Sequence, residues 1–236
     1  MTACFYGIGV GPGDPELLTL KAVRLIQSAD IICYLKTSKG QSLARDIAQN
    51  WITTQQDLPI LMPPMRIQRG KINQTYDQAA KDISQLLDQG KNIAFLCEGD
   101  PFFFGSYIYL YQRLHKNYSC HIISGISSIH ASSALAGIPL VQQNENLAVL
   151  SSRNTDEELL QGLKQFSSVV IMKAGLHRAR LVRLIIDAKR EQQACYIERA
   201  GQTEEIIQHD ISSLPKTAGD YFSLFLISQN GKKLNI

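Results

Sequence analysis

Apolar residues recur along the first half of the chain in two alternating rhythms. Short continuous apolar runs predict buried strands over Cys4–Val10, Ile31–Leu35 and Asn92–Cys97. Between these runs, apolar residues spaced by three or four positions predict helices, one capped by Asp14 and another closed by Gly90. Strand–helix alternation of this kind predicts a mostly parallel sheet with right-handed crossovers.

A Pro-rich stretch interrupts the alternation. It follows a short helix expected over Ser42–Trp51, and we interpret it as an irregular link marked by Pro59, Pro63 and Pro64. Its basic side chains could form an ordinary solvated face, or they could neutralise a substrate with several carboxylates. These residues are Arg66, Arg69 and Lys71.

After Lys116 the pattern restarts with a strand over Cys120–Ile123. Thr155–Glu158 has the form of a capping box and predicts the start of a helix. Three further strands are expected at the end of the chain. No helix separates the first two of them, so this half should contain a mixed sheet. They are Ala194–Ile197, Glu205–His209 and Tyr221–Ser228. The sequence thus predicts an α/β chain of two domains, with a mostly parallel sheet in residues 1–117 and a mixed sheet in residues 118–236.

Composition and charge are those of a soluble globular protein. The chain has 236 residues, of which 44% are apolar, and a net charge of +3, which argues against a dedicated nucleic-acid surface. The five cysteines show no Cys-x-x-Cys spacing, which fits a reducing compartment. No apolar run approaches the ~18–20 residues of a membrane span, and no signal peptide is apparent. We therefore expect a cytoplasmic protein that is not bound to a membrane.

The segment Glu98–Ser106 is the first candidate for a binding site. It combines a Gly-Asp-Pro turn with three successive phenylalanines, directly after a predicted buried strand. In α/β sheets, ligands bind beyond the carboxyl ends of the strands. The aromatic run would suit a flat heteroaromatic ligand, although a tight turn with core aromatics explains it equally well.

The glycines Gly7, Gly9 and Gly11 suggest a dinucleotide fingerprint, but two features oppose it. The third glycine of that motif would fall on Pro12, which has no N–H for a phosphate. The second strand leads to Lys36 and not to the acid that would hold a ribose. A glycine-rich turn that lets the backbone approach a bulky substrate or a helix remains the alternative.

Other catalytic signatures are weak. The sequence contains no Walker A motif, no His-Glu-x-x-His and no ligand-like histidine spacing, so no metal is expected. The segment Gly125–Ile129 lacks the second glycine of a nucleophile elbow, and its Ser127 and Ser128 would either cap a helix or hold a ligand. A second basic cluster has the same two interpretations as the first. It comprises Lys173, His177, Arg178, Arg180 and Arg183.

Taken together, several segments resemble the signature motifs of the S-adenosylmethionine-dependent tetrapyrrole methyltransferases, in the right order and over nearly the whole chain. They are Gly7–Ala22, Cys97–Ser106, Ser124–Ser128, Val169–Lys173 and Glu198–Gly201. Within that family, Glu98 and the segments Gly137–Leu140 and Asn144–Leu150 are most similar to the subgroup that methylates C20 of precorrin-2 in cobalamin biosynthesis. Ser124 and Phe104 depart from the usual Pro and Tyr, which puts a substrate contact of the Tyr hydroxyl in doubt.

The resemblance implies a two-domain class III methyltransferase fold with S-adenosylmethionine in the interdomain cleft, released as S-adenosylhomocysteine. It also implies a homodimer and a tetrapyrrole substrate with eight carboxylates, either metal-free or cobalt-loaded, which would give Arg66, Arg69 and Lys71 a purpose. Methylation of uroporphyrinogen III at C2 and C7, a protein or RNA substrate, and a binding module without catalysis remain alternatives. By position, the cofactor would be lined by Pro12, Glu98, Gly99, Asp100, Phe103, Ser127, Ser128, Met172 and Ala200.

Overall fold

The structure, a computed structural model, describes residues 3–61 and 69–229. For residues 69–71 it describes the backbone only. Arg66 therefore lies outside the described residues, and the structure places only the backbone of Arg69 and Lys71. The chain divides into two compact units, Met1–Ser127 and Ser128–Ile236, and each is described by itself.

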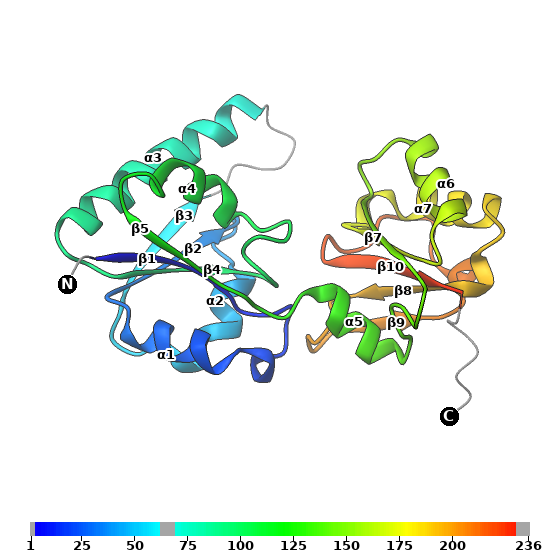
Figure 1. The fold of residues 1–236 in the computed structure, drawn as a ribbon, viewed down its shortest axis with the longest axis horizontal. Coiled ribbons are helices and arrows are strands. Elements are labelled where there is room, and N and C mark those ends of the chain that lie inside the picture. Colours follow the sequence, from blue (N-terminus) through cyan, green and yellow to red (C-terminus); the bar gives the residue numbers. More distant parts are fainter. Residues whose placement is uncertain (1–2, 62–68, 230–236) are drawn as a thin grey trace. The chain divides into compact units, whose positions relative to one another are not determined.

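The described part of the first unit is an α/β layer structure with a five-stranded sheet (Figure 1). All the strand pairs are parallel, in the order β3-β2-β4-β1-β5. In chain order its elements are β1 (Cys4–Gly9), η1 (Pro15–Leu17), α1 (Leu20–Ser28), β2 (Ile31–Lys36), α2 (Leu43–Ala48), η2 (Gln49–Trp51), β3 (Gln56–Leu61), α3 (Arg69–Asp88), β4 (Ile93–Cys97), α4 (Tyr107–Leu114) and β5 (Ser119–Ile123).

The helices cover both faces of this sheet, with α1 and α2 on one face and α3 and α4 on the other (Figure 1). The connection that leaves β1 runs through α1 toward β2, whereas the connection that leaves β4 runs through α4 toward β5. The chain therefore departs in opposite directions from two neighbouring strands. The carboxyl ends of β1 and β4 form a topological switch point, where α/β sheets bind their ligands.

Two predicted features of this unit need correction. Residues 56–61 are not an irregular link but the edge strand β3, in which Pro59 pairs with Tyr34. An edge strand tolerates proline because half of its N–H groups point away from the sheet. In addition, η1 and α1 replace the single helix expected from Asp14, because a second cap, Thr19, accepts the N–H of Ala22 (3.2 Å) and starts α1 anew.

The domain boundary also differs from the sequence-based one. The sequence pattern placed it near residue 117, which assigned the strand after Lys116 to the second domain. In the structure β5 pairs in parallel with β1, so that Phe5 faces Cys120, and the strand completes the first sheet. The two units separate after Ser127.

The second unit is built around a mixed sheet, as the sequence predicted. Within residues 128–229, which the structure describes, its order is β6-β7-β10-β8-β9, and only β6 and β7 are parallel neighbours. The predicted capping box is confirmed, because Thr155 and Glu158 exchange side-chain to backbone hydrogen bonds at the start of α6. The elements are α5 (Ser128–Ala136), β6 (Leu147–Ser151), α6 (Asp156–Gln165), β7 (Ser168–Met172), η3 (Gly175–His177), α7 (Arg178–Asp187), η4 (Glu191–Gln193), β8 (Ala194–Glu198), β9 (Ile206–Gln208), η5 (Ile211–Ser213) and β10 (Ser223–Ser228).

In the described part of the chain, no helix combines the length and the hydrophobicity that a bilayer span requires.

Candidate functional site

The switch-point corner consists of the three loops that follow β1, β4 and β5, namely residues 10–14, 98–106 and 124–127. Backbone hydrogen bonds join the first two loops beyond the ends of their strands. Val10 N donates to Cys97 O (2.9 Å), and Gly11 and Gly99 form an antiparallel bridge in which Gly99 N donates to Gly11 O (2.8 Å). This edge of the sheet, the candidate ligand site, is therefore lined by main chain.

Glycines allow the third loop to join this junction. A Cβ atom on Gly9 would stand 2.6 Å from the Cα of Gly125, and a Cβ on Gly125 would stand 2.7 Å from the Cα of Gly9. Both hypothetical atoms would also collide with the carbonyl oxygen of Gly99. Real Cβ atoms essentially never approach so closely, so the three loops can meet only because these positions carry no side chain.

Gly7 has a different partner, which decides one question left open by the sequence. A Cβ on Gly7 would lie 2.5 Å from the ring of Tyr107, on α4. The hydroxyl of Tyr107 donates to the carbonyl of Phe5 (3.2 Å), so this buried ring crosses β1 at Gly7. The bulky group that Gly7 accommodates is therefore a helix residue and not a ligand.

Asp100 connects two of the loops through its carboxylate. Oδ1 accepts the N–H of Phe102 (2.8 Å), and Oδ2 accepts the N–H of Gly125 (3.2 Å). A carboxylate has about four lone-pair sites, so further acceptor capacity remains for a ligand. The structure thus gives Asp100 an architectural function, and its expected contact with the cofactor stays a prediction.

The three phenylalanines of the corner differ in their surroundings. Phe102 packs on Tyr107 and meets Tyr111 edge-on, with ring centroids 5.1 Å apart. Phe103 is half-buried, whereas Phe104 is 46% exposed and has a left-handed backbone (φ 55°). Such a conformation costs a non-glycine residue roughly 1–3 kcal/mol, and strain of this kind clusters at functional sites.

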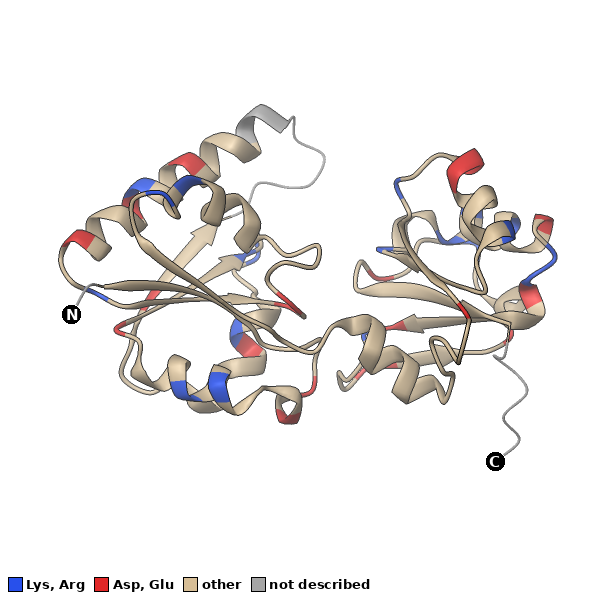
Figure 2. Cartoon of the chain, in the orientation of Figure 1, with Lys and Arg blue, Asp and Glu red and all other residues tan. Residues whose placement is uncertain are grey.

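The charge of the corner is one-sided. Its three loops contain Asp14, Glu98 and Asp100 but no Lys or Arg. In Figure 2 the loop after β4 is accordingly red at its start, tan elsewhere and without blue. Carboxylates close to a main-chain junction favour a cationic or dipolar ligand over a phosphate. This electrostatic pattern supports the sequence-based argument against a dinucleotide.

Cys97, at the end of β4, is not a candidate nucleophile. Burial raises the pKa of its thiol far above the usual value, so the sulfur is protonated at neutral pH. Its Sγ lies 4.0 Å from the hydroxyl of Ser106. The residue fills space beneath the corner.

The second unit presents its own candidate residues at one edge of its sheet. Met172 ends β7, and Ala200 follows the end of β8. The antiparallel strand β10 begins between these two strands, with Leu224 opposite Met172 and Ser223 opposite Glu198. Ser128 is the first residue of α5, and Ser127 is the last residue of the first unit and is buried.

Sequence reasoning missed a polar cluster beneath this edge. The carboxylate of Glu198 accepts hydrogen bonds from the Tyr196 hydroxyl (2.5 Å) and from Asp220 N (3.0 Å), and it lies 3.7 Å from the Arg178 guanidinium. Arg178 also donates to Thr217 O (2.7 Å). These contacts fix the segment before β10 against β8. A carboxylate at the end of an apolar strand was the available sequence signal, but its partners are distant in the chain.

The second basic cluster turns out to be largely architectural. Arg178 is buried in the cluster just described, and Arg180 and Arg183 both bind Asp156 at the start of α6, at 2.6 and 2.8 Å. Arg180 also donates to Ser152 O (2.9 Å). For these three arginines the structure favours a role within the fold over direct contact with a substrate.

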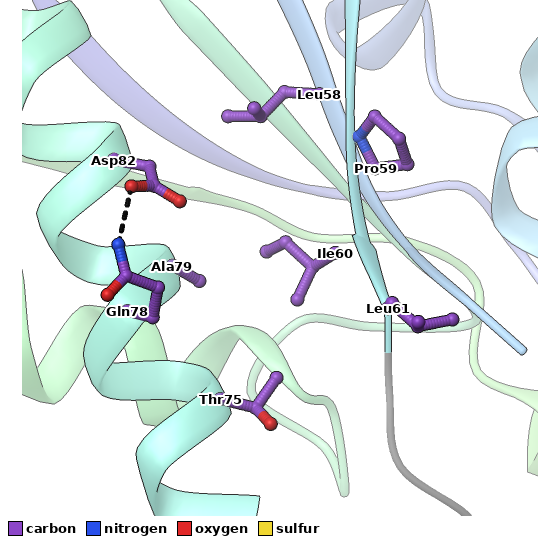
Figure 3. Close-up of a pocket in the computed structure, with 8 residues that line it drawn as sticks. All are labelled: Leu58, Pro59, Ile60, Leu61, Thr75, Gln78, Ala79 and Asp82. Atoms are coloured by element: carbon purple, nitrogen blue, oxygen red, sulfur yellow. Dashed lines mark hydrogen bonds between the residues drawn. The ribbon is translucent and has the colours of Figure 1, made fainter. Parts of the chain in front are cut away.

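A separate groove of about 300 Å³ lies between β3 and α3 (Figure 3). Leu58 and Ile60 point from the strand toward the helix, where Gln78 donates to Asp82 (2.8 Å). No residue predicted to bind the cofactor lines this groove. In the sheet β2 separates β3 from β4, so this groove is distinct from the candidate site at the end of β4.

The fold and the corner define an α/β protein with a backbone-lined, acidic candidate site at the carboxyl ends of parallel strands. Residues 4–215 match the family described as Tetrapyrrole (Corrin/Porphyrin) Methylases. The chain belongs to this family. The sequence-based recognition of the family and the predicted α/β fold class are thereby confirmed.

Curated relatives share about a third of the aligned residues. A precorrin-2 C(20)-methyltransferase from a Sinorhizobium species is 32% identical over 229 residues, which are 94% of this chain and 93% of that protein. A cobalt-precorrin-2 C(20)-methyltransferase from Salmonella typhimurium is 30% identical over 80% of both chains. The cobalamin biosynthesis protein CobIJ of Mycobacterium tuberculosis is 32% identical over 94% of this chain, but the match spans only 45% of that longer protein.

Solved structures support the architecture. A cobalt precorrin-4 methyltransferase superposes with a TM-score of 0.76 at 17% identity and covers 97% of this chain and 96% of its own. A uroporphyrin-III C-methyltransferase from Thermus thermophilus, complexed with S-adenosylhomocysteine, gives a TM-score of 0.68 at 19% identity and covers 96% and 98%. At these identities the likeness concerns the fold alone.

Proposed function

We propose that this protein is an S-adenosylmethionine-dependent C-methyltransferase that methylates C20 of precorrin-2, or of its cobalt-containing form, in cobalamin biosynthesis. The observation that carries this proposal is the end-to-end similarity to the Sinorhizobium relative, whose name states both the substrate and the position of the methyl group. The Salmonella relative names the cobalt-containing substrate at the same position.

The switch-point corner has suitable chemistry for the methyl donor. S-adenosylmethionine carries a sulfonium and an ammonium group together with a flat adenine ring. The acidic loops, the close approach of main chain that the glycines allow and the half-buried Phe103 match these features. From the first unit Pro12, Glu98, Gly99, Asp100, Phe103 and Ser127 would hold the donor, and from the second unit Ser128, Met172 and Ala200.

The proposed reaction needs placement more than acid–base catalysis. When bound, the donor would supply a methyl cation equivalent: the bond from sulfur to methyl would break as a bond from C20 to methyl forms, neutral S-adenosylhomocysteine would leave, and the proton of C20 would pass to solvent. The chain would hold C20 about 3–3.5 Å from the methyl group, an alignment that can lower the barrier by up to about 7–11 kcal/mol. An electron-rich carbon of a reduced tetrapyrrole needs no strong protein base.

The proposal extends to the substrate contacts and the assembly. Arg66, Arg69 and Lys71 would neutralise carboxylates of the tetrapyrrole, because guanidinium and ammonium groups pair strongly with carboxylates. The functional protein would be a homodimer in the cytoplasm. Sedimentation velocity of the purified protein, with and without S-adenosylhomocysteine, tests the dimer.

The decisive experiment locates the transferred methyl group. The purified protein is incubated with precorrin-2 or its cobalt form and S-adenosylmethionine labelled with carbon-13 in the methyl group. We expect a product heavier by one methyl, with the label at C20 by NMR. A parallel incubation with uroporphyrinogen III tests the alternative, and labelling at its C2 and C7 would assign that methyltransferase activity instead. Cofactor binding without turnover on either substrate would indicate a binding module.

A further inference from the structure

The strand-end edge of the second sheet continues as an ordered surface beyond β7, β10 and β8. Ala174 N donates to Ser223 O (3.0 Å), and Arg199 N donates to Phe222 O (2.8 Å). On the other side, Gly219 N donates to Gly175 O (3.0 Å). These bonds hold residues 173–176, 199–201 and 219–222 side by side next to Met172.

Large apolar side chains gather on this edge. Leu176 is 62% exposed, Phe222 is 39% exposed, and Tyr221 meets Phe222 edge-on with ring centroids 5.3 Å apart. Leu176 reaches the same surface because Gly175 packs directly on the backbone of Asp220, where a Cβ would have no room. We call Leu176, Tyr221 and Phe222 the apolar ledge. Leu176 and Phe222 are exposed and Tyr221 is half-buried, and all three project from adjoining backbone segments. Exposed apolar side chains grouped in this way are a candidate binding surface.

A lysine is held beside the ledge at an energetic cost. Lys173 directly follows Met172, and its Nζ lies 5.7 Å from the centre of the Tyr221 ring. Its backbone is left-handed (φ 59°), and the buried hydroxyl of Ser152 donates to its carbonyl (2.7 Å) and stabilises this conformation. The strained, well-supported backbone fixes the point at which the Lys173 side chain leaves the main chain, and strain of this kind clusters at functional sites.

The acidic groups of the same edge are engaged by the chain itself. Asp220 binds Arg199 (2.8 Å), and Glu198 is held by the cluster around Arg178 and Tyr196. Arg199 also pairs with Glu204. The carboxylates of this edge are therefore held by contacts within the fold.

We propose that the apolar ledge and Lys173 bind the tetrapyrrole, with the flat macrocycle on Leu176, Tyr221 and Phe222 and a peripheral carboxylate on Lys173. This inference rests on the proposed function, because the acceptor carbon must lie within about 3–3.5 Å of the methyl group of a donor that Met172 helps to hold. A macrocycle with an apolar face and a rim of carboxylates matches this combination of side chains. None of the three ledge residues was singled out by the sequence.

Binding of uroporphyrin III, a stable porphyrin with eight carboxylates, to the full chain tests the proposal. We expect Leu176→Ala and Phe222→Ala each to weaken porphyrin binding about five- to thirtyfold, because each removes apolar area that the ligand covers. Lys173→Gln should weaken it about three- to tenfold and reduce its salt dependence. Affinity for S-adenosylhomocysteine, measured by calorimetry, should stay within about twofold in all three variants.

Two exposed residues elsewhere in the same unit supply matched controls. Ile186 on α7 is 44% exposed, and Lys164 on α6 is exposed. Ile186→Ala and Lys164→Gln should leave porphyrin affinity unchanged. Leu176 is so exposed that its replacement should not impair folding, which circular dichroism verifies.

Three outcomes distinguish a failure of this proposal from a failure of the proposed function. Unchanged porphyrin affinity in Leu176→Ala and Phe222→Ala, with S-adenosylhomocysteine still bound, would overturn the ledge and leave the proposed function intact. A shift of these variants to a smaller oligomer with normal porphyrin binding would also overturn it, because the ledge would then be a contact between subunits. A wild-type chain that binds neither ligand would overturn the proposed function itself.

Discussion

The backbone N–H of Gly125 donates to Oδ2 of Asp100 across 3.2 Å, and so joins the loop after β5 to the loop after β4. The other carboxylate oxygen accepts the N–H of Phe102 within its own loop (2.8 Å). One side chain thus fixes two of the three loops of the switch-point corner. Any ligand held by this corner depends on Asp100 through the position of the main chain, in addition to any direct contact.

Replacing Asp100 with Ala should weaken S-adenosylhomocysteine binding and also destabilise the fold. It leaves the partly buried N–H of Gly125 without its acceptor, which costs about 1–3 kcal/mol. The exposed N–H of Phe102 also loses its acceptor but can bind water instead, so its loss costs less. We expect binding to weaken by a similar amount in calorimetry and the urea midpoint to fall. Asp100→Asn retains one amide oxygen and should show a smaller effect on both measurements.

Asp14→Ala is the matched control for this prediction. Asp14 also lies in the corner, but its carboxylate accepts only the exposed N–H of Glu16 (2.8 Å) among the hydrogen bonds described for it. Its loss should cost about 1 kcal/mol of stability or less. If Asp100→Ala left both affinity and stability at the wild-type value, the structural role of its carboxylate would be refuted.

The close contact of Gly9, Gly99 and Gly125, the glycine junction, leads to a second prediction. Gly125→Ala should lower the melting temperature strongly and abolish S-adenosylhomocysteine binding, because its Cβ would collide with the backbone of Gly9 and Gly99. Backbone cannot swing aside as a side chain can, so the loops must separate. Gly40→Ala is the comparison: its Cβ would meet nothing within 4 Å, although its φ of 82° makes the substitution costly by about 1 kcal/mol.

A modest loss in Gly125→Ala, equal to that of Gly40→Ala and with full ligand affinity, would contradict the proposed junction. Differential scanning calorimetry with and without S-adenosylhomocysteine measures both properties in one experiment. In the wild type the ligand should raise the melting temperature, and in Gly125→Ala it should not.

The sequence predicted those parts of the fold that depend on local pattern. β1, β2 and β4 were recognisable because their runs are apolar on both faces, as in a buried parallel strand. The capping box at Thr155 and the glycine that follows α3 are also local signals, and Gly90 indeed has a left-handed backbone (φ 81°). Such features need no knowledge of distant partners.

The remaining features depend on pairing that a local pattern does not contain. β3 escaped recognition because, as an edge strand, it carries Gln56, Asp57 and Pro59 in place of an apolar run. The run in β5 was visible, but nothing in it shows that it pairs with β1 and not with a strand of the second sheet. The bond between Asp100 and Gly125 spans 25 positions and follows only from the assembled sheet.

The cluster around Glu198 predicts a specific pH dependence. Burial, and the hydrogen bond to Glu198, raise the pKa of Tyr196 to about 12, above the value near 10 expected in the unfolded chain. The folded state therefore keeps the Tyr196 proton up to a higher pH than the unfolded chain does. The stability that the protonated hydroxyl contributes is complete below pH 10 and is lost as the pH rises from about 10 to 12. Tyr196→Phe should make the decline of the unfolding free energy over this range less steep.

Urea titrations at pH 8, 10 and 11 measure this slope. Tyr118→Phe is the control, since Tyr118 is half-buried and only donates to Asp88 at the surface (3.0 Å) among its described bonds. Its slope should equal that of the wild type. Equal slopes in Tyr196→Phe and the wild type would mean that the hydroxyl is not perturbed as the structure indicates.

The basic residues before and at the start of α3 provide a test of substrate binding that is independent of the ledge. Replacing Arg66 and Arg69 together with Ala should raise the KM for the tetrapyrrole, because two guanidinium groups that could pair with carboxylates are lost. The KM for S-adenosylmethionine should hardly change.

The double variant Lys21→Ala and Arg24→Ala on α1 removes the same charge elsewhere in the first unit. If both double variants raised the tetrapyrrole KM equally, a long-range effect of net charge would explain the result, and an unaltered KM in both would assign Arg66 and Arg69 to an ordinary solvated face.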